Sequence, residues 1–195
     1  MTAEIVRDLP EGEERAAADA RMRELLSRPD PGPVGARLAL LHFTGRRTGR
    51  AYTVPAGVHT LGDALVVATG SGWRLNFAGG ADGALTWQGR RWPARFTLLT
   101  DPERTARGYL ELYRRYGDAA PRRLGVAVRG GGTPGLAAFR TAVERHGLSL
   151  VTVGTDAPAP GGGSAGRAGA GDAAAAPPAH GTPQASETAN ERTPR

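Results

Sequence analysis

The sequence lacks both cysteine and lysine, and all 25 of its basic residues are arginine. Without cysteine the chain forms no disulfide bonds, carries out no thiol chemistry and holds no thiolate metal site. Its four histidines, His42, His59, His146 and His180, follow no metal-ligand spacing, so we expect no metal site. These absences argue against enzymes that use a cysteine nucleophile or a metal held by cysteine or histidine. They leave chemistry that a bound organic cofactor could supply.

Long hydrophobic runs are also missing. No stretch approaches the ~20 apolar residues that cross a membrane. The amino terminus is acidic and mixed, unlike a secretory signal peptide. We therefore expect a cytoplasmic protein without a transmembrane segment, while peripheral contact with a membrane surface stays open.

The formal net charge is +6. A basic protein attracts nucleic acid, anionic lipid or small anionic molecules. The sequence contains no helix-turn-helix, zinc-finger or RNA-binding strand pattern, so we expect no nucleic-acid partner. Anionic lipid and small anionic molecules stay open as partners.

Composition divides the chain into three parts. Residues 1–35 hold a predicted helix and a proline-rich connection, and residues 36–155 carry the strand-like runs. Residues 156–195 contain almost only Ala, Gly, Pro, Ser and Thr among their uncharged positions, with no aromatic residue. Such a segment cannot bury enough apolar surface to offset its chain entropy, so we expect a disordered tail.

Hydrophobic spacing predicts a strand-rich centre with peripheral helices. Helices are expected over 11–27, 101–116 and 134–145, with one helical turn over 73–78. Strands are expected over 37–44, 51–59, 64–69, 83–88, 92–99 and 148–153. Leu38, Leu40 and His42 would share one strand face, and a strand that contains Pro55 should lie at an edge or a bulge. Residues 89–91 would form a hairpin turn, and Asp101 a helix cap. The order favours an α+β fold built on a small antiparallel barrel.

The loop Gly45-Arg46-Arg47-Thr48-Gly49-Arg50 joins two of these strands. Glycines let backbone N–H groups turn toward an anion, and arginine forks bind phosphate or carboxylate through two hydrogen bonds. The loop therefore looks like an anion cradle at the end of a hairpin, although a solvated hairpin tip would have the same composition.

This loop, followed by Pro55, by Leu-Gly-Asp and Val-Val-Ala, and by Gly72-Trp73-Arg-Leu-Asn76-Phe77, resembles the deazaflavin-dependent nitroreductase family. The resemblance covers residues 36–116, with weaker similarity to Val153. Members of that family are split β-barrels, typical of actinobacteria, that bind the deazaflavin coenzyme F(420). The resemblance implies an α+β split β-barrel of the flavin-reductase or FMN-binding type with peripheral helices, and a homodimer is compatible with it.

The resemblance also assigns cofactor contacts. The loop would hold the phosphate and acidic tail of the coenzyme, whereas one strand and the break after the next would frame its ring. The residues implied are Arg46, Arg47, Thr48, Gly49, Arg50, Tyr52, Val54, Pro55, Ala56, Thr69, Gly70, Ser71, Gly72, Trp73 and Asn76. Two features depart from the family: the segment before Trp73 is shorter, and Tyr52 stands where an arginine is common. For Trp73 and Asn76, the residue types alone favour a core anchor and a helix cap.

Three hydroxyls are candidates for supplying a proton: Ser71, Tyr109 and Tyr113. Tyr109, Tyr113 and Tyr116 share a helix face, for which core packing is the simpler interpretation. His42 is expected to be a satisfied core histidine, and Arg90, Arg91, Arg122 and Arg123 to be surface charges.

The resemblance thus implies an oxidoreductase that transfers a hydride from reduced coenzyme F(420) to an electron-poor small molecule such as a quinone, an enone or a nitro compound. Two alternatives stay open. One is an FMN-dependent enzyme on the same barrel. The other is a non-catalytic protein of the same fold that binds a cofactor or a lipid.

Overall fold

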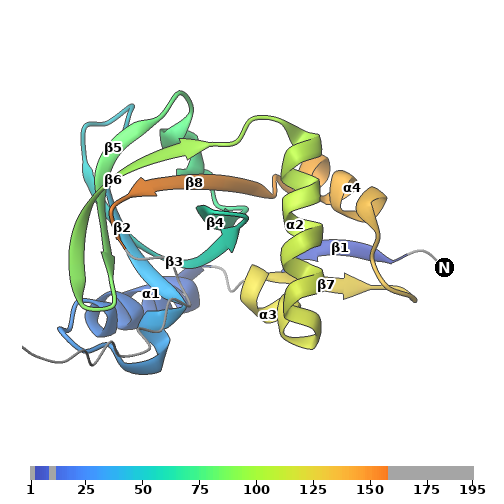
Figure 1. Cartoon of the computed structure of the whole chain (residues 1–195), viewed down its shortest axis with the longest axis horizontal. Coiled ribbons are helices and arrows are strands. Elements are labelled where there is room, and N and C mark those ends of the chain that lie inside the picture. Colours follow the sequence, from blue (N-terminus) through green and yellow to red (C-terminus); the bar gives the residue numbers. More distant parts are fainter. Residues whose placement is uncertain (1–2, 9–11, 158–195) are drawn as a thin grey trace, which may run out of the picture. The chain divides into compact units, whose positions relative to one another are not determined.

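Six strands form a closed antiparallel barrel in the order β2-β3-β4-β8-β6-β5, seen at the left of Figure 1. Their bounds are Leu38–Thr44 (β2), Ala51–Leu61 (β3), Ala64–Thr69 (β4), Ala81–Trp87 (β5), Arg90–Leu98 (β6) and Ser149–Thr155 (β8). The predicted α+β split barrel with peripheral helices is confirmed by this arrangement.

The computed structural model describes residues 3–8 and 12–157, which belong to one compact unit. Residues 158–195, which are almost all of the predicted tail, lie outside the described residues.

The barrel interior is filled by side chains that alternate along each strand. On β2 these are Ala39, Leu41 and Phe43, all buried. Leu38, Leu40 and His42 share the other face, as predicted, and this face is the outer one. His42 is half-buried there, and its two ring nitrogens lie 3.0 and 2.8 Å from the hydroxyls of Thr53 and Thr86. The expectation of a satisfied histidine is confirmed, but its place is outside the barrel core.

Strand β4 is buried on both faces, as its continuous apolar run predicts. Val67 belongs to the barrel core, whereas Val66 belongs to a second core formed with the helices. Strand β8 is shared in the same way, with Val151 inside the barrel and Leu150 facing the helices. These two strands therefore join the barrel to the helical layer.

The helical layer gathers on one side of the barrel in Figure 1. It contains α2 (Pro102–Tyr116), α3 (Ala120–Leu124), α4 (Leu136–His146) and the antiparallel pair β1 (Glu4–Arg7) and β7 (Val126–Arg129). As predicted, Asp101 caps α2: its carboxylate accepts a hydrogen bond from the Arg104 N–H at 3.1 Å. No described helix is both long and apolar enough to span a bilayer.

Helix α1 (Gly12–Leu26) lies against β2 and β3 and buries fully only Leu26, which agrees with its weak apolar stripe. Short 3-10 helices follow at η1 (Gly32–Ala36), η2 (Gly72–Phe77) and η3 (Gly117–Ala119). The η2 helix is the turn predicted over 73–78.

The β5–β6 hairpin differs from its prediction. The turn consists of Gln88 and Gly89, whose φ angles are 50° and 73°, and strand β6 already begins at Arg90. A two-residue hairpin turn with positive φ at both positions matches the twist of its strands. The predicted turn at residues 89–91 was therefore placed one residue too late.

The strands β1 and β7 and the helix α3 were not predicted. Each has only four or five residues, too short to show a period. Ile5 of β1 is nonetheless almost completely buried within the helical core.

We therefore expect Ile5→Ala to lower the free energy of unfolding by about 2–5 kcal/mol, because it removes a buried side chain and leaves a cavity. Urea unfolding followed by circular dichroism measures this change. Glu4→Ala, an exposed residue of the same strand, is the control and should change stability little. Equal, small effects of both substitutions would show that β1 does not contribute to the core.

Candidate functional site

The site begins where strands β3 and β4 separate. Their pairing ends at Val58 and Val67, before either strand has ended. The residues that would continue the ladder line a cavity of about 280 Å³ instead. They are Ala56, Gly57, Ala68 and Thr69. The barrel wall therefore opens at this point, and small side chains keep the opening wide.

Pro55 lies on the open edge of β3. The N–H of Val58 donates to the carbonyl of Arg37 at 2.9 Å, on the side of β2. Because successive residues of an antiparallel strand alternate their hydrogen-bonding direction, the backbone groups of Gly57 and Pro55 point to the other side, into the opening. Proline has no N–H to leave unpaired there. The expectation that Pro55 marks an edge is confirmed.

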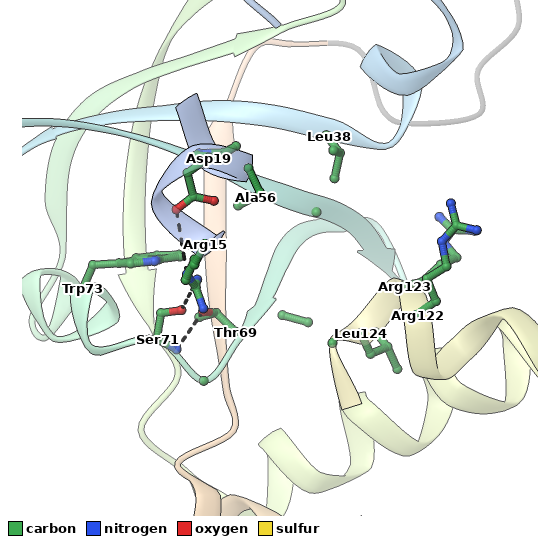
Figure 2. A pocket seen from close by; sticks show the side chains of 16 residues that line it. Arg15, Asp19, Leu38, Ala56, Thr69, Ser71, Trp73, Arg122, Arg123 and Leu124 are labelled. Carbon is green, nitrogen blue, oxygen red and sulfur yellow. Dashed lines mark hydrogen bonds and ion pairs between the residues drawn. The ribbon is translucent and has the colours of Figure 1, made fainter. Parts of the chain in front are cut away.

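Two neighbouring cavities, of about 280 and 440 Å³, occupy the space between this edge and helix α1. Both are lined by Arg15, Asp19, Pro55, Ser71 and Trp73. We call the two cavities together the α1 cleft. Figure 2 shows Arg15, Ser71 and Trp73 at one end and Arg122 and Arg123 of α3 at the other.

The loop after β4 forms one wall of the cleft. The Ser71 N–H donates to the Thr69 hydroxyl at 3.0 Å, and the Arg74 guanidinium donates to the carbonyls of Ser71 at 3.0 Å and Gly70 at 3.5 Å. From behind, the Tyr109 hydroxyl donates to the Thr69 carbonyl at 3.3 Å. The wall is thus fixed by side chains that come from three different elements.

Helix α1 is joined to this wall by one polar contact. The Arg15 guanidinium donates to the Ser71 hydroxyl oxygen at 2.9 Å, and it also lies 3.8 Å from the Asp19 carboxylate. Ser71 is buried, and its oxygen accepts from a cation, so its own O–H is free to donate elsewhere. A hydroxyl in this position can orient a ligand or pass on a proton.

The arginine-rich loop lies apart from the two cavities, whose linings do not include it. Most of its amides are already used. The Gly45 N–H donates to Arg50, that of Gly49 to Gly45, that of Arg50 to the Thr48 hydroxyl, and that of Arg46 to the Asn76 side chain. The expectation of a backbone cradle is therefore wrong for these four amides. The guanidinium groups of Arg46, Arg47 and Arg50 are exposed and form no ion pair within the described residues.

Asn76 connects this loop to the cleft. Its amide oxygen accepts from the Arg46 N–H at 2.9 Å, and its amide nitrogen donates to the Trp73 carbonyl at 2.8 Å. Trp73 lines both cavities and packs beside Phe43, on which Tyr52 stacks with ring centroids 5.4 Å apart. Asn76 and Tyr52 therefore hold the geometry of the loop and of Trp73, and Trp73 alone of the three faces the cleft.

Only one of the three candidate proton donors lines the cleft. Tyr109 is completely buried, and its hydroxyl donates to the carbonyls of Thr69 and Ser149; burial raises its pKa well above the usual range. Tyr113 packs edge-on against Phe139 between α2 and α4. The interpretation of these tyrosines as core residues is favoured, and Ser71 is the candidate that a ligand can reach.

The structure thus brings together eight of the residues that the resemblance assigned to the cofactor. They are Val54, Pro55, Ala56, Thr69, Gly70, Ser71, Gly72 and Trp73. Sequence reasoning missed Arg15 and Asp19, because a weakly amphipathic helix gives no sign of which residues face a cleft. It took Arg122 and Arg123 for surface charge: Arg122 is exposed, as expected, but both residues also line the cleft, because they lie on the short α3, which was not predicted.

No protein-family model and no curated protein matches this sequence. Among solved structures, a pyridoxamine 5'-phosphate oxidase-related, FMN-binding protein from Nostoc punctiforme matches with 17% identity and a TM-score of 0.40, over 75% of this chain and 83% of that chain. An FAD- and heme-binding protein from Mycobacterium smegmatis matches with 21% identity and a TM-score of 0.34, over 70% and 65%. A proposed 5-nitroimidazole antibiotic resistance protein from Bacteroides thetaiotaomicron matches with 11% identity and a TM-score of 0.32, over 80% and 86%.

We expect Tyr109→Phe to lower the free energy of unfolding by about 1–3 kcal/mol, since the buried carbonyls of Thr69 and Ser149 lose their shared donor. Urea unfolding measures the change. Tyr113→Phe is the matched control on the same helix, because the Tyr113 hydroxyl forms no hydrogen bond within the described part of the chain. An equal loss in both variants would contradict the special position of Tyr109.

Proposed function

We propose that this protein is an oxidoreductase that uses the deazaflavin coenzyme F(420). The coenzyme, when bound, supplies a hydride to an electron-poor acceptor such as a quinone, an enone or a nitro compound. The protein supplies binding, orientation and a proton, and for this it needs neither a nucleophile nor a metal.

One observation carries the proposal. The seven residues that the resemblance assigned to the coenzyme ring come from two separate segments, residues 54–56 and 69–72, and all of them line the α1 cleft, as does Trp73. The β3–β4 hairpin brings these segments side by side, and a complete ladder would have closed the space between them. The ladder instead ends at Val58 and Val67, and both segments line a cavity, which is the feature that supports the resemblance.

The residues of the cleft suit a flat heterocycle. Pro55, Ala56 and Trp73 offer apolar and aromatic surface. The open edge of β3 directs backbone groups of Gly57 and Pro55 at the ligand, where the polar edge of a ring can replace the missing strand. The larger cavity, about 440 Å³, falls within the usual range of cofactor sites, roughly 300–1,000 Å³, and the smaller one, about 280 Å³, lies just below it.

The arginine-rich loop suits an anionic tail through its side chains. Arg46, Arg47 and Arg50 are exposed cations without a carboxylate partner in the described residues, and Asn76 fixes the loop against η2, which begins at the cleft. Arginine forks bind phosphate and carboxylate with matching geometry. A ligand with its ring in the cleft and its acidic tail at this loop would use both features.

Ser71 is the residue that we propose for proton delivery. Its oxygen accepts from Arg15, so its O–H can be directed into the cleft toward the acceptor or toward a water molecule. The nearby guanidinium stabilises negative charge that develops on the acceptor as a hydride arrives. Asp19 beside Arg15 keeps that guanidinium in place.

The proposal is tested by titrating the purified full-length protein with oxidised F(420), followed by the coenzyme's fluorescence, with FMN in parallel. Saturable binding of F(420) alone, weakened by added salt, is the expected result, because the acidic tail binds through exposed charges. Saturable binding of FMN alone would assign the barrel to flavin chemistry. Absence of binding by either compound would refute the proposal.

We expect Arg47→Ala to weaken F(420) binding about tenfold, since a hydrogen bond to a charged group contributes about 1.5–3 kcal/mol. Arg91→Ala removes one exposed arginine from β6, far along the chain from this loop, and serves as the control for net charge. If neither Arg47→Ala nor Arg50→Ala changes the affinity, the loop is not part of the binding site.

A further inference from the structure

His59 of β3 is a buried histidine with only half of its ring satisfied. It is 3% exposed, and its Nδ1 lies 2.9 Å from the Tyr116 hydroxyl. Its Nε2 is buried and has no hydrogen-bond partner within the described residues. Leaving a buried polar atom unpaired is unfavourable, so this atom needs an explanation.

The unpaired nitrogen faces the cleft through a glycine. A Cβ added at Gly57 would lie 3.3 Å from Nε2 and 3.7 Å from the Arg123 carbonyl, and Gly57 lines the cavity described above. His59 itself lines an adjoining cavity of about 340 Å³. This cavity shares with the α1 cleft Leu38, Gly57, Arg122 and Arg123. Nε2 therefore lies directly behind a position of the cavity wall that carries no side chain.

Three arginines surround this adjoining cavity, and we call it the basic end of the cleft. They are Arg37, Arg122 and Arg123. None of the three forms an ion pair within the described residues, and no carboxylate lines this cavity. Unpaired guanidinium groups around a concave surface present a positive potential that an anion would balance.

The ring of His59 adds a hydrogen-bond donor to these cations. Burial, and then the charges of Arg123 and Arg115, lower its pKa to about 4, so the ring is neutral at neutral pH. The Arg123 guanidinium lies 3.6 Å from the centre of the Tyr116 ring. In the tautomer in which the Tyr116 O–H donates to Nδ1, the ring hydrogen resides on Nε2, which is then a donor without an acceptor. The anion site proposed below uses this tautomer.

We propose that the basic end binds an anionic group, a carboxylate or a phosphate, carried by the electron-poor acceptor. The claim that this anionic group belongs to the acceptor rests on the proposed function, whereas anion binding at His59, Arg122 and Arg123 does not. The coenzyme's acidic tail is assigned to Arg50 and its neighbours, seven residues from Gly57 and therefore roughly 20 Å away along an extended strand. The arginine-rich loop and the basic end are thus two separate groups of arginines, and each would bind one of the two ligands.

The first test observes His59 directly. The full-length protein is labelled with nitrogen-15 in its four histidines, and the ring nitrogens are followed by NMR while inorganic phosphate or benzoate is added. We expect a saturable shift of the His59 Nε2 signal with at least one of the two anions. A shift with phosphate alone identifies a phosphorylated acceptor, and a shift with benzoate alone identifies a carboxylate. The absence of a shift with both anions overturns the proposal.

Three variants test the geometry. Arg123→Ala should lower the affinity for the anion about tenfold, and Arg122→Ala should lower it too. Gly57→Ala should abolish the shift, because its methyl group would lie 3.3 Å from Nε2 and exclude the anion. The backbone conformation at Gly57 accepts alanine, so this variant tests the site even if an arginine variant fails to fold. Arg91→Ala controls for net charge and should leave the shift unchanged. Equal shifts in all four variants would show nonspecific screening and overturn the proposal.

The second test separates this proposal from the proposed function. With reduced F(420) as the hydride donor, a benzoquinone carboxylic acid is compared with its methyl ester. Arg123→Ala should raise KM about tenfold for the acid and leave the ester unchanged. An equal effect on the KM of the acid and of the ester overturns the proposal. Loss of the phosphate-induced His59 shift when F(420) is added also overturns it, because the coenzyme would then occupy the basic end. A His59 shift without any F(420) binding would leave the anion site standing and remove the coenzyme assignment.

Discussion

The early end of the β3–β4 ladder is the constraint on which the rest of this structure depends. Pairing stops at Val58 and Val67, although both strands continue. Backbone groups that lose their ladder partners must find others or face an opening, and here they face the α1 cleft. The small side chains of Ala56, Gly57 and Ala68 keep that opening free. A barrel whose ladder were complete at this point would have no site.

The sequence predicted the elements that are long and periodic, and some of their chemistry. Pro55 indicated an open strand edge, and Asp101 indicated a helix start; both indications depend on local backbone physics and hold in the structure. The elements β1, α3 and β7 escaped prediction because four or five residues show no period. The basic end of the cleft was missed with them, since Arg122 and Arg123 line it only because α3 folds there.

The arginine-rich loop shows where residue types mislead. Its glycines suggested free amides, but four of its amides are bonded within the loop or to Asn76. These hydrogen bonds make the loop rigid. The groups that stay able to bind an anion are its guanidinium groups, which are exposed to solvent. A rigid loop with exposed cations loses little conformational freedom when a ligand binds, which favours affinity as much as a backbone cradle would.

Helix α1, which covers the cleft, is attached more weakly than the walls of the cleft. Helix α1 buries only Leu26 fully and reaches the opposite wall through the Arg15–Ser71 hydrogen bond. The walls, by contrast, belong to a barrel with a filled interior and are supported by Tyr109 and Arg74. Elements with few buried contacts open at the lowest free-energy cost. An opening of α1 would therefore break the Arg15–Ser71 hydrogen bond and cost less free energy than a rearrangement of the two walls.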